Sequence, residues 1–126
     1  MTKIIPVTAL LLALLIAPAQ AQTAGEMLSW CSGVARTARV TTNGNVSLPP
    51  TTESGMCWGA FTALQQSLVY SGSDGKPLLG VCAPAEGTRL QLVQVFSSYA
   101  RQHPEKHHYE FMDMALIALS VAFPCQ

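Results

Sequence analysis

Charged residues are scarce in this chain. Asp, Glu, Lys and Arg together make up 11% of the sequence, against roughly 25% in an average soluble domain. The seven basic residues balance the seven acidic ones, and no basic cluster suited to nucleic acid or a membrane surface is present. We therefore expect no nucleic-acid partner. Hydrophobic residues make up 49% of the chain, more than a small domain can bury, so part of the surface is expected to meet a protein partner or a second copy.

The chain also lacks a hydrophobic run long enough to span a membrane. The longest run, Ile4–Ala17, has about 14 residues, whereas a spanning helix needs about 20. It follows a short lead with one basic residue, Lys3, and precedes Ala19-Gln20-Ala21, the A-x-A pattern that signal peptidase cleaves. We predict that residues 1–21 are a signal peptide. Residues 22–126 would then form one mature exported domain without a membrane attachment.

No two cysteines are close enough to form a CxxC zinc knuckle. Four widely spaced cysteines in an exported chain predict two disulfides, for which three connectivities exist. They are Cys31, Cys57, Cys82 and Cys125. The short junction at His103–Pro104 favours a hairpin of the last two helices, which would bring Cys82 and Cys125 to the same end. We therefore favour Cys82–Cys125 and, by elimination, Cys31–Cys57.

A convincing catalytic constellation is missing as well. Gly-rich phosphate loops are absent, and Glu110 and Asp113 make at best a weak carboxylate pair. Gly55-Met56-Cys57-Trp58-Gly59 matches the G-x-C-x-G form of a nucleophile elbow, but an elbow follows a strand and needs a free thiolate. Here a loop rich in Pro and Thr precedes it, and the cysteine is expected to be oxidised. We predict neither enzymatic activity nor a cofactor.

All three histidines lie in one short segment, at His103, His107 and His108. They are weak candidates for a metal site, because two ligands would have to share one helical face. A solvated first helical turn explains the same residues, so we expect no metal.

What the chain does have is helical periodicity, and we expect an all-α domain of about four helices. Thr23-Ala24-Gly25-Glu26 and Thr88-Arg89-Leu90-Gln91 are capping boxes that mark two helix starts. With the 3.6-residue recurrence of apolar side chains, they predict helices over 23–39, over 53 or 54 to 70, over 88–102, and over 104–123. The third is apolar on two sides, which is typical of a helix between neighbours. The fourth is almost wholly apolar from Phe111 onward, so we expect it to be the central helix.

Two connecting segments are rich in turn-forming residues. Residues 40–52 contain Asn43-Gly44-Asn45 and predict a surface loop, and residues 71–77 contain a second cluster of Gly, Ser and Asp. Residues 78–83 read as a short extended apolar piece.

Several blocks of this sequence, in their order and spacing, resemble the Tai/Rap immunity family. The matching blocks cover about Trp30 to Cys125, and they are Gly55-Met56-Cys57-Trp58-Gly59-Ala60-Phe61, Val81-Cys82-Ala83-Pro84, Gly87-Thr88 with Gln91-Leu92-Val93, Tyr99 with His103-Pro104-Glu105 and His108, and Ala115-Leu116 with Ala122-Phe123-Pro124-Cys125. One departure is Ala60-Phe61, where the family pattern has a Gly-Tyr pair. This difference concerns side-chain packing more than the role of the protein.

The resemblance implies an all-α, often dimeric periplasmic immunity protein that inhibits a type VI-secreted, peptidoglycan-cleaving cysteine amidase. It also implies inhibition by occlusion, in which a surface loop enters the catalytic cleft of the enzyme. The candidate contact residues lie in the two turn-rich segments and are Asn43, Asn45, Ser73, Asp74 and Lys76. Both segments could equally be plain connectors.

Two other functions compete with this one. The first is a periplasmic helical binding or chaperone-like protein without a toxin partner, which an isolated gene would favour and an adjacent amidase gene would not. The second is a small metal-dependent or cysteine hydrolase, which would lose activity on replacement of His107 or Cys57 with the fold unchanged.

Overall fold

The computed structural model describes residues 20–126 and contains four α-helices, one short 3₁₀ helix and one two-stranded sheet. The predicted signal peptide lies outside the described residues except for its last two. In chain order the elements are α2 (Ala24–Thr37), β1 (Arg39–Val40), β2 (Val46–Ser47), α3 (Thr52–Ser67), α4 (Arg89–Gln102), η1 (Pro104–Lys106) and α5 (Phe111–Ala122). The expected all-α class is confirmed, with the hairpin β1–β2 as a small addition.

Threonine caps begin three of the helices. Thr23 and Thr88 form the two predicted capping boxes, in which the threonine hydroxyl accepts from the backbone N–H three residues on and Glu26 or Gln91 accepts in return. Thr51 caps α3 through the N–H of Ser54. Thus α3 begins at Thr52, slightly earlier than expected, and ends at Ser67 instead of Tyr70.

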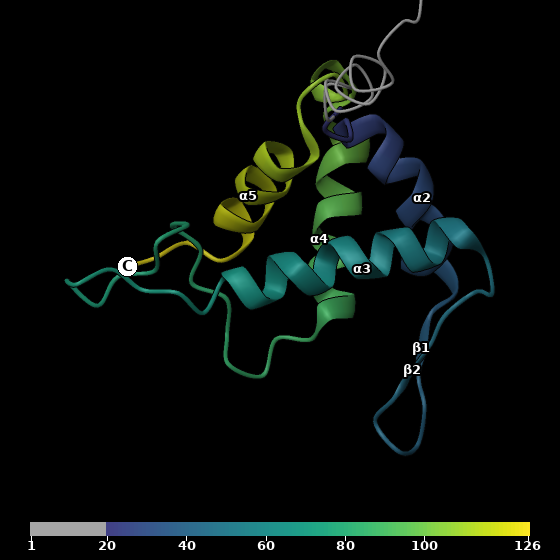
Figure 1. Ribbon diagram of the computed structural model, residues 1–126, viewed down its shortest axis with the longest axis horizontal. Coiled ribbons are helices and arrows are strands. Elements are labelled where there is room, and N and C mark those ends of the chain that lie inside the picture. Colours follow the sequence, from purple (N-terminus) through teal and green to yellow (C-terminus); the bar gives the residue numbers. More distant parts are fainter. Residues whose placement is uncertain (1–19) are drawn as a thin grey trace, which may run out of the picture.

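Helix α4 occupies the centre of the molecule and packs against α2, α3 and α5. In Figure 1 it stands upright in the middle, with α3 crossing in front, α2 on the right and α5 on the left. This corrects the expectation that the last helix is central. Helix α5 packs mainly on α4 and α2, and it leaves Met112 and Val121 exposed. Its apolar composition exceeds what the domain can bury.

Three phenylalanines form the middle of the core, one each from α3, α4 and α5. The ring centroids of Phe61, Phe96 and Phe111 lie 5.3–5.6 Å apart in tilted or edge-to-face pairs, the arrangement that aromatic quadrupoles favour. Around them lie the buried faces of all four α-helices.

The last helix is shorter than the expected 104–123. Residues 104–106 form η1, a turn follows, and α5 begins only at Phe111. The intervening backbone pairs with the start of the described chain: Ala24 N–H donates to the Tyr109 carbonyl at 2.8 Å, Gly25 N–H to the His107 carbonyl at 3.0 Å, and Phe111 N–H to the Gln22 carbonyl at 2.8 Å. These long-range hydrogen bonds satisfy the orphan donors at the N-terminus of α2 and interrupt the helix.

The predicted loop 40–52 contains a short antiparallel hairpin. Arg39 pairs with Ser47 and Val40 with Val46, and Gly44 at the tip has a φ of 79°. Asn-Gly is a strong hairpin turn signal as well as a loop signal, which accounts for the difference.

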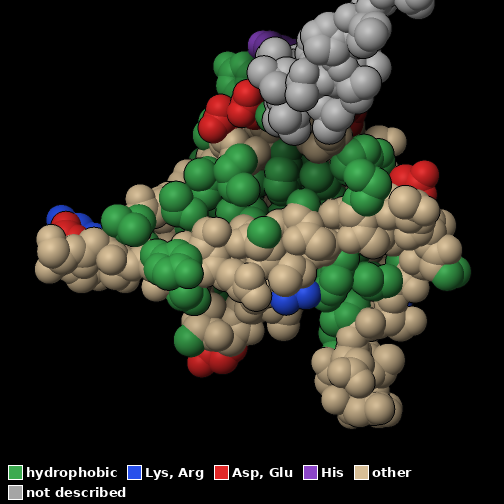
Figure 2. Space-filling model, in the orientation of Figure 1, with side chains coloured by type: hydrophobic (Ala, Val, Ile, Leu, Met, Phe, Trp, Pro, Cys, Tyr) green, Lys and Arg blue, Asp and Glu red, His purple; other side chains and the backbone are tan. Residues whose placement is uncertain are grey.

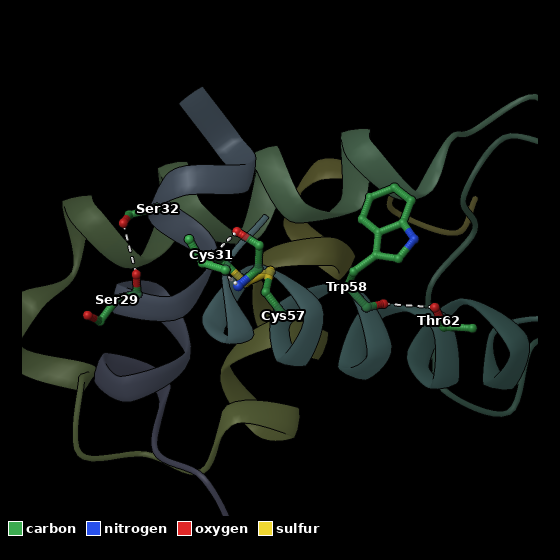
Figure 3. Close-up of a disulfide and its surroundings, with 8 residues drawn as sticks. Ser29, Cys31, Ser32, Cys57, Trp58 and Thr62 are labelled. Carbon is green, nitrogen blue, oxygen red and sulfur yellow. Dashed lines mark hydrogen bonds between the residues drawn. A yellow bond between two sulfur atoms is a disulfide. The ribbon is translucent and has the colours of Figure 1, made fainter. Parts of the chain in front are cut away.

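The two disulfides have the favoured pairing. Cys31–Cys57 joins α2 to α3 inside the core, with both cysteines fully buried (Figure 3). Cys82–Cys125 joins the segment before α4 to the chain end beyond α5. Both of its cysteines are exposed. One bridge therefore fixes the helix packing, and the other fastens the surface segments at the far end.

Candidate protein-binding surface

Two segments project from the helical body. The hairpin tip at 41–45 extends at the lower right of Figure 1, and the turn at 71–77 extends at the left beside the C-terminus. Asn43 and Asn45 are both exposed on the first, and Ser73, Asp74 and Lys76 are all exposed on the second. The predicted contact residues therefore form two separate sets on different sides of the molecule.

The turn at 71–77 is ordered by its own hydrogen bonds. Gly72 N–H donates to the Lys76 carbonyl at 2.8 Å, and Asp74 Oδ1 accepts from Lys76 N–H at 3.0 Å. An isolated bridge pairs Ser71 with Pro77 at its base. The Asp74 carboxylate therefore helps to shape the turn, while the Ser73 and Lys76 side chains make no hydrogen bond to other residues in the range 20–126.

Three large apolar side chains stand exposed at the base of this turn. Val69, Tyr70 and Leu78 are 77%, 64% and 65% exposed. Leu78 N–H donates to the Tyr70 carbonyl at 2.9 Å, and this hydrogen bond holds the two ends of the turn together. We call these three residues the 69–78 patch. Sequence reasoning missed it, because Tyr70 was assigned to the second helix and Leu78 to an extended piece.

Beside the 69–78 patch, the surface is hollowed. The hollow encloses about 350 Å³ between the end of α3 and the segment before α4, within the size range of small ligand pockets. Its lining is mostly apolar and includes Leu68, Val69, Val81, Pro84 and Leu92. The polar side chain in its wall is Gln65, which bonds to the Gly87 carbonyl and to Arg89.

The surrounding framework is braced at several points. Cys82 N–H donates to the Phe123 carbonyl at 3.0 Å next to the Cys82–Cys125 disulfide. The Arg89 guanidinium lies 4.8 Å from the Trp58 ring, which ties the start of α4 to α3. The 69–78 patch is thus presented by a segment fixed at both ends.

The hairpin offers a different surface. Its tip is uncharged, and its hydroxyl groups are engaged locally: Thr41 Oγ1 donates to the Asn45 carbonyl, and Thr42 Oγ1 to Asn43 Oδ1. Val40 is its exposed apolar residue, at 57%.

The three histidines point to different partners. His103 Nδ1 lies 3.1 Å from Glu105 Oε1 and its ring stacks on Tyr99, His107 Nε2 lies 2.7 Å from the Ala100 carbonyl, and His108 packs edge-on against Tyr109. In the described part of the chain, no group of three or more His, Cys, Asp or Glu side chains is placed to hold a metal ion. These residues connect α4 to the turn that follows it.

Two charged groups in the same region have shifted pKa values. The pKa of Glu105 is lowered, first by its own backbone N–H and then by His103. The pKa of Lys106 is raised, because its ammonium donates to the Tyr99 hydroxyl at 3.1 Å. Glu105 is exposed and Lys106 is half-buried, and both shifts favour the charged forms.

Cys57 does not have the setting of a nucleophile. It lies within α3, follows a helical turn instead of a strand, and is disulfide-bonded and fully buried. Figure 3 shows it joined to Cys31, with the neighbouring Trp58 carbonyl accepting from the Thr62 hydroxyl. A thiolate needed for attack is therefore unavailable at this position.

Among known proteins, the chain matches the family model of Rap1a immunity proteins over residues 11–125. The chain belongs to the Rap1a immunity protein family. No curated protein and no solved structure shows significant similarity to it.

Membership of the Rap1a family indicates an immunity protein for a secreted effector. The described features that suit such a role are the braced turn, the 69–78 patch and the adjoining hollow. Across residues 20–126, no helix is both long and apolar enough to cross a membrane.

Proposed function

We propose that this Rap1a family member binds a type VI-secreted, peptidoglycan-cleaving amidase in the periplasm and occludes its active site. The observation that carries the proposal is the family match over residues 11–125. The two disulfides support an oxidising compartment, which agrees with a signal peptide over residues 1–21. Purified mature protein should inhibit a co-encoded amidase stoichiometrically, and failure to form a complex at micromolar concentration would overturn the proposal.

We place the enzyme on the 69–78 patch and its turn, in preference to the hairpin. An exposed tyrosine such as Tyr70 is typical of the anchors that dominate interface energies, and Val69 and Leu78 extend the apolar surface around it. The turn is held by internal hydrogen bonds and by the Cys82–Cys125 bridge, so little ordering entropy is lost on docking. Ser73 and Lys76 at its tip would then enter or border the catalytic cleft.

A matched pair of substitutions tests this placement. Val69→Asp puts a charge into the 69–78 patch and should weaken inhibition by at least about tenfold, since a buried interface charge without a partner costs several kcal/mol. Val40→Asp makes the same change at the exposed hairpin valine and should leave inhibition unchanged. Inhibition constants for both variants decide the matter. Loss of inhibition in Val40→Asp alone would assign the contact to the hairpin.

The protein is proposed to act by contact and not by catalysis. Cys57 and His107, the residues that a hydrolase would need, are engaged in a disulfide and in a hydrogen bond to the Ala100 carbonyl. Inhibition should therefore be stoichiometric with the amidase. Turnover of any substrate that disappears on replacement of one side chain would contradict this.

A periplasmic binding or chaperone-like protein without a toxin partner is the second candidate. The apolar hollow of about 350 Å³ favours it, because its size suits a small apolar ligand or side chain. A pull-down from the producing cells separates the two functions. Recovery of an amidase favours immunity, whereas diverse apolar clients without an amidase favour the alternative.

We also propose that the protein forms a homodimer through a band between α3 and the start of α5. Hydrophobic side chains gather along this edge of α3 in Figure 2. The band contains the exposed residues Met56 and Met112, and a second hollow of about 270 Å³ is lined by Ala60, Ala63 and Phe111 among others. A two-fold interface would bring this apolar surface against the same surface of a second copy.

A further inference from the structure

Among residues 20–126, Gln22 is held by one backbone hydrogen bond. The Gln22 carbonyl accepts from Phe111 N–H at 2.8 Å, and Thr23 and Glu110 form the bridge that follows. Within residues 20–126, no hydrogen bond uses the Gln22 nitrogen or its side-chain amide. The residue is half-buried and lines the hollow between α3 and α5.

Cleavage after Ala21 converts the Gln22 nitrogen into a free α-amine. This amine then belongs to the same residue as a γ-carboxamide, and attack on the residue's own side-chain carbonyl forms a five-membered lactam. We propose that Gln22 of the mature protein is a modification site and is converted to pyroglutamate. The inference rests on the export proposed above.

The reaction balances without a co-reactant. The α-nitrogen forms a bond to Cδ, the bond from Cδ to the side-chain nitrogen breaks, and that nitrogen leaves as ammonia after taking a proton from the attacking amine. Because both groups are carried by one residue, the step has the high effective concentration of an intramolecular reaction.

The folded structure permits this step, and the neutral product suits its surroundings better than the free amine does. The bond from Phe111 N–H holds the Gln22 carbonyl, which the cyclisation does not touch, so the α-nitrogen and side chain can approach each other while the pairing with 109–111 persists. The new lactam is neutral. An α-ammonium at this position would lie next to Thr23, the N-cap of α2, where the helix dipole disfavours positive charge.

The other charged groups nearby are Glu26 and Glu110. The Glu26 carboxylate already accepts from the Thr23 backbone N–H and hydroxyl. Glu110 is exposed, lines the same hollow, and remains solvated without an ammonium partner. The rest of the lining includes Met27, Ala63 and Met112, against which a neutral ring is easier to desolvate than an ammonium, above all if a second copy covers this band.

The test is the mass and N-terminal peptide of the protein recovered from the periplasm after expression of the full chain. The expected product begins at residue 22, is lighter than the unmodified mature chain by one ammonia, and resists Edman degradation. Gln22→Glu is the matched control, because a γ-carboxyl is a much poorer acyl donor than a γ-carboxamide. Its mature chain should keep a free amine that is open to Edman sequencing.

A mature chain with unmodified Gln22 overturns the inference, and so does a mature chain that begins at any other residue. To exclude cyclisation during handling, an aliquot is quenched in acid at harvest and should already contain the lactam; a lactam that accumulates only during purification counts against it. The measurement does not involve the amidase. If the protein carries the lactam but inhibits no amidase, this inference stands and the proposed function is wrong. If the protein inhibits an amidase but has an unmodified N-terminus, the proposed function stands and this inference is wrong.

Discussion

Two serines lie in the core, and their hydroxyls differ in surroundings. Ser54 is 2% exposed, and its oxygen accepts from the Thr51 hydroxyl at 2.9 Å. Ser97 is fully buried on α4, and within residues 20–126 its hydroxyl has no hydrogen-bond partner. The two positions therefore contrast a satisfied buried hydroxyl with an orphaned one.

Replacing each serine with alanine should change stability in opposite directions. Ser97→Ala removes an unpaired polar group from the core and improves helix propensity, and it should raise the free energy of unfolding by about 1 kcal/mol. Ser54→Ala breaks a hydrogen bond and should lower that free energy by about 1 kcal/mol. Urea denaturation midpoints measure both. A large decrease in the free energy of unfolding of Ser97→Ala would mean that the Ser97 hydroxyl has a hydrogen-bond partner.

Two glycines of α2 provide a second contrast. A Cβ at Gly25 would lie 3.2 Å from His107 Cβ, while a Cβ at Gly33 would lie 3.7 Å from its nearest neighbours, which is ordinary contact. His107 cannot yield easily, because its carbonyl accepts from Gly25 N–H and its ring is bonded to the Ala100 carbonyl.

We expect Gly33→Ala to stabilise the protein by about 1 kcal/mol through helix propensity. Gly25→Ala should destabilise it by about 1 kcal/mol, because the propensity gain is outweighed by overpacking. Thermal unfolding by circular dichroism compares the two. Equal stabilisation in both variants would show that the 107–110 turn moves aside freely.

At the scale of elements, the sequence located a helix start well where a capping box marks it. Thr23 and Thr88 begin capping boxes whose signal is complete within four residues, and both helices start where expected. The last helix was predicted from Pro104, but its backbone at 107–111 is bonded to residues 22–25. A local pattern contains no trace of a partner so far away in the chain.

The candidate site could likewise be predicted from the sequence only in part. The turn at 71–77 could be found from its Gly, Ser and Asp residues, and the disulfide pairing followed from the hairpin of the last two helices. The 69–78 patch could not, because exposed Val69 and Leu78 have the same sequence signature as buried residues of a helix or strand. Their exposure depends on where α3 ends, which only the tertiary structure fixes.

The two disulfides should differ in their resistance to reduction. Cys31 and Cys57 are fully buried, whereas Cys82 and Cys125 are exposed. Limiting reductant under native conditions should therefore open Cys82–Cys125 first, since exchange requires access to sulfur. Mass spectrometry of alkylated peptides identifies the labelled pair.

Opening the Cys82–Cys125 bridge should also weaken inhibition of the amidase, because the segment that presents the 69–78 patch loses a constraint at one end. The Cys82→Ser/Cys125→Ser variant provides the same state without reductant. Simultaneous labelling of all four cysteines would indicate that the domain unfolds before the outer bridge reacts.

At the scale of the whole molecule, the proposed dimer can be tested along one helix. Met112 lies at the start of α5 within the proposed band, and Val121 lies near its other end; they are 40% and 65% exposed. Met112→Lys should convert the dimer to a monomer in sedimentation equilibrium, because it places an unpaired charge in an apolar interface. Val121→Lys should leave the dimer intact. A monomeric parent protein at tens of micromolar would remove the dimer proposal.

The pairing of residues 22–25 with 107–111 has a consequence for the timing of folding. The N-terminus of α2 receives these acceptors from His107 and Tyr109, far along the chain, and the second disulfide needs Cys125. If the chain is exported N-terminus first, as proposed above, it cannot complete this clasp until residues 107–111 have emerged. On that proposal, residues 22–25 lack these hydrogen-bond partners during most of the translocation, and the clasp forms late.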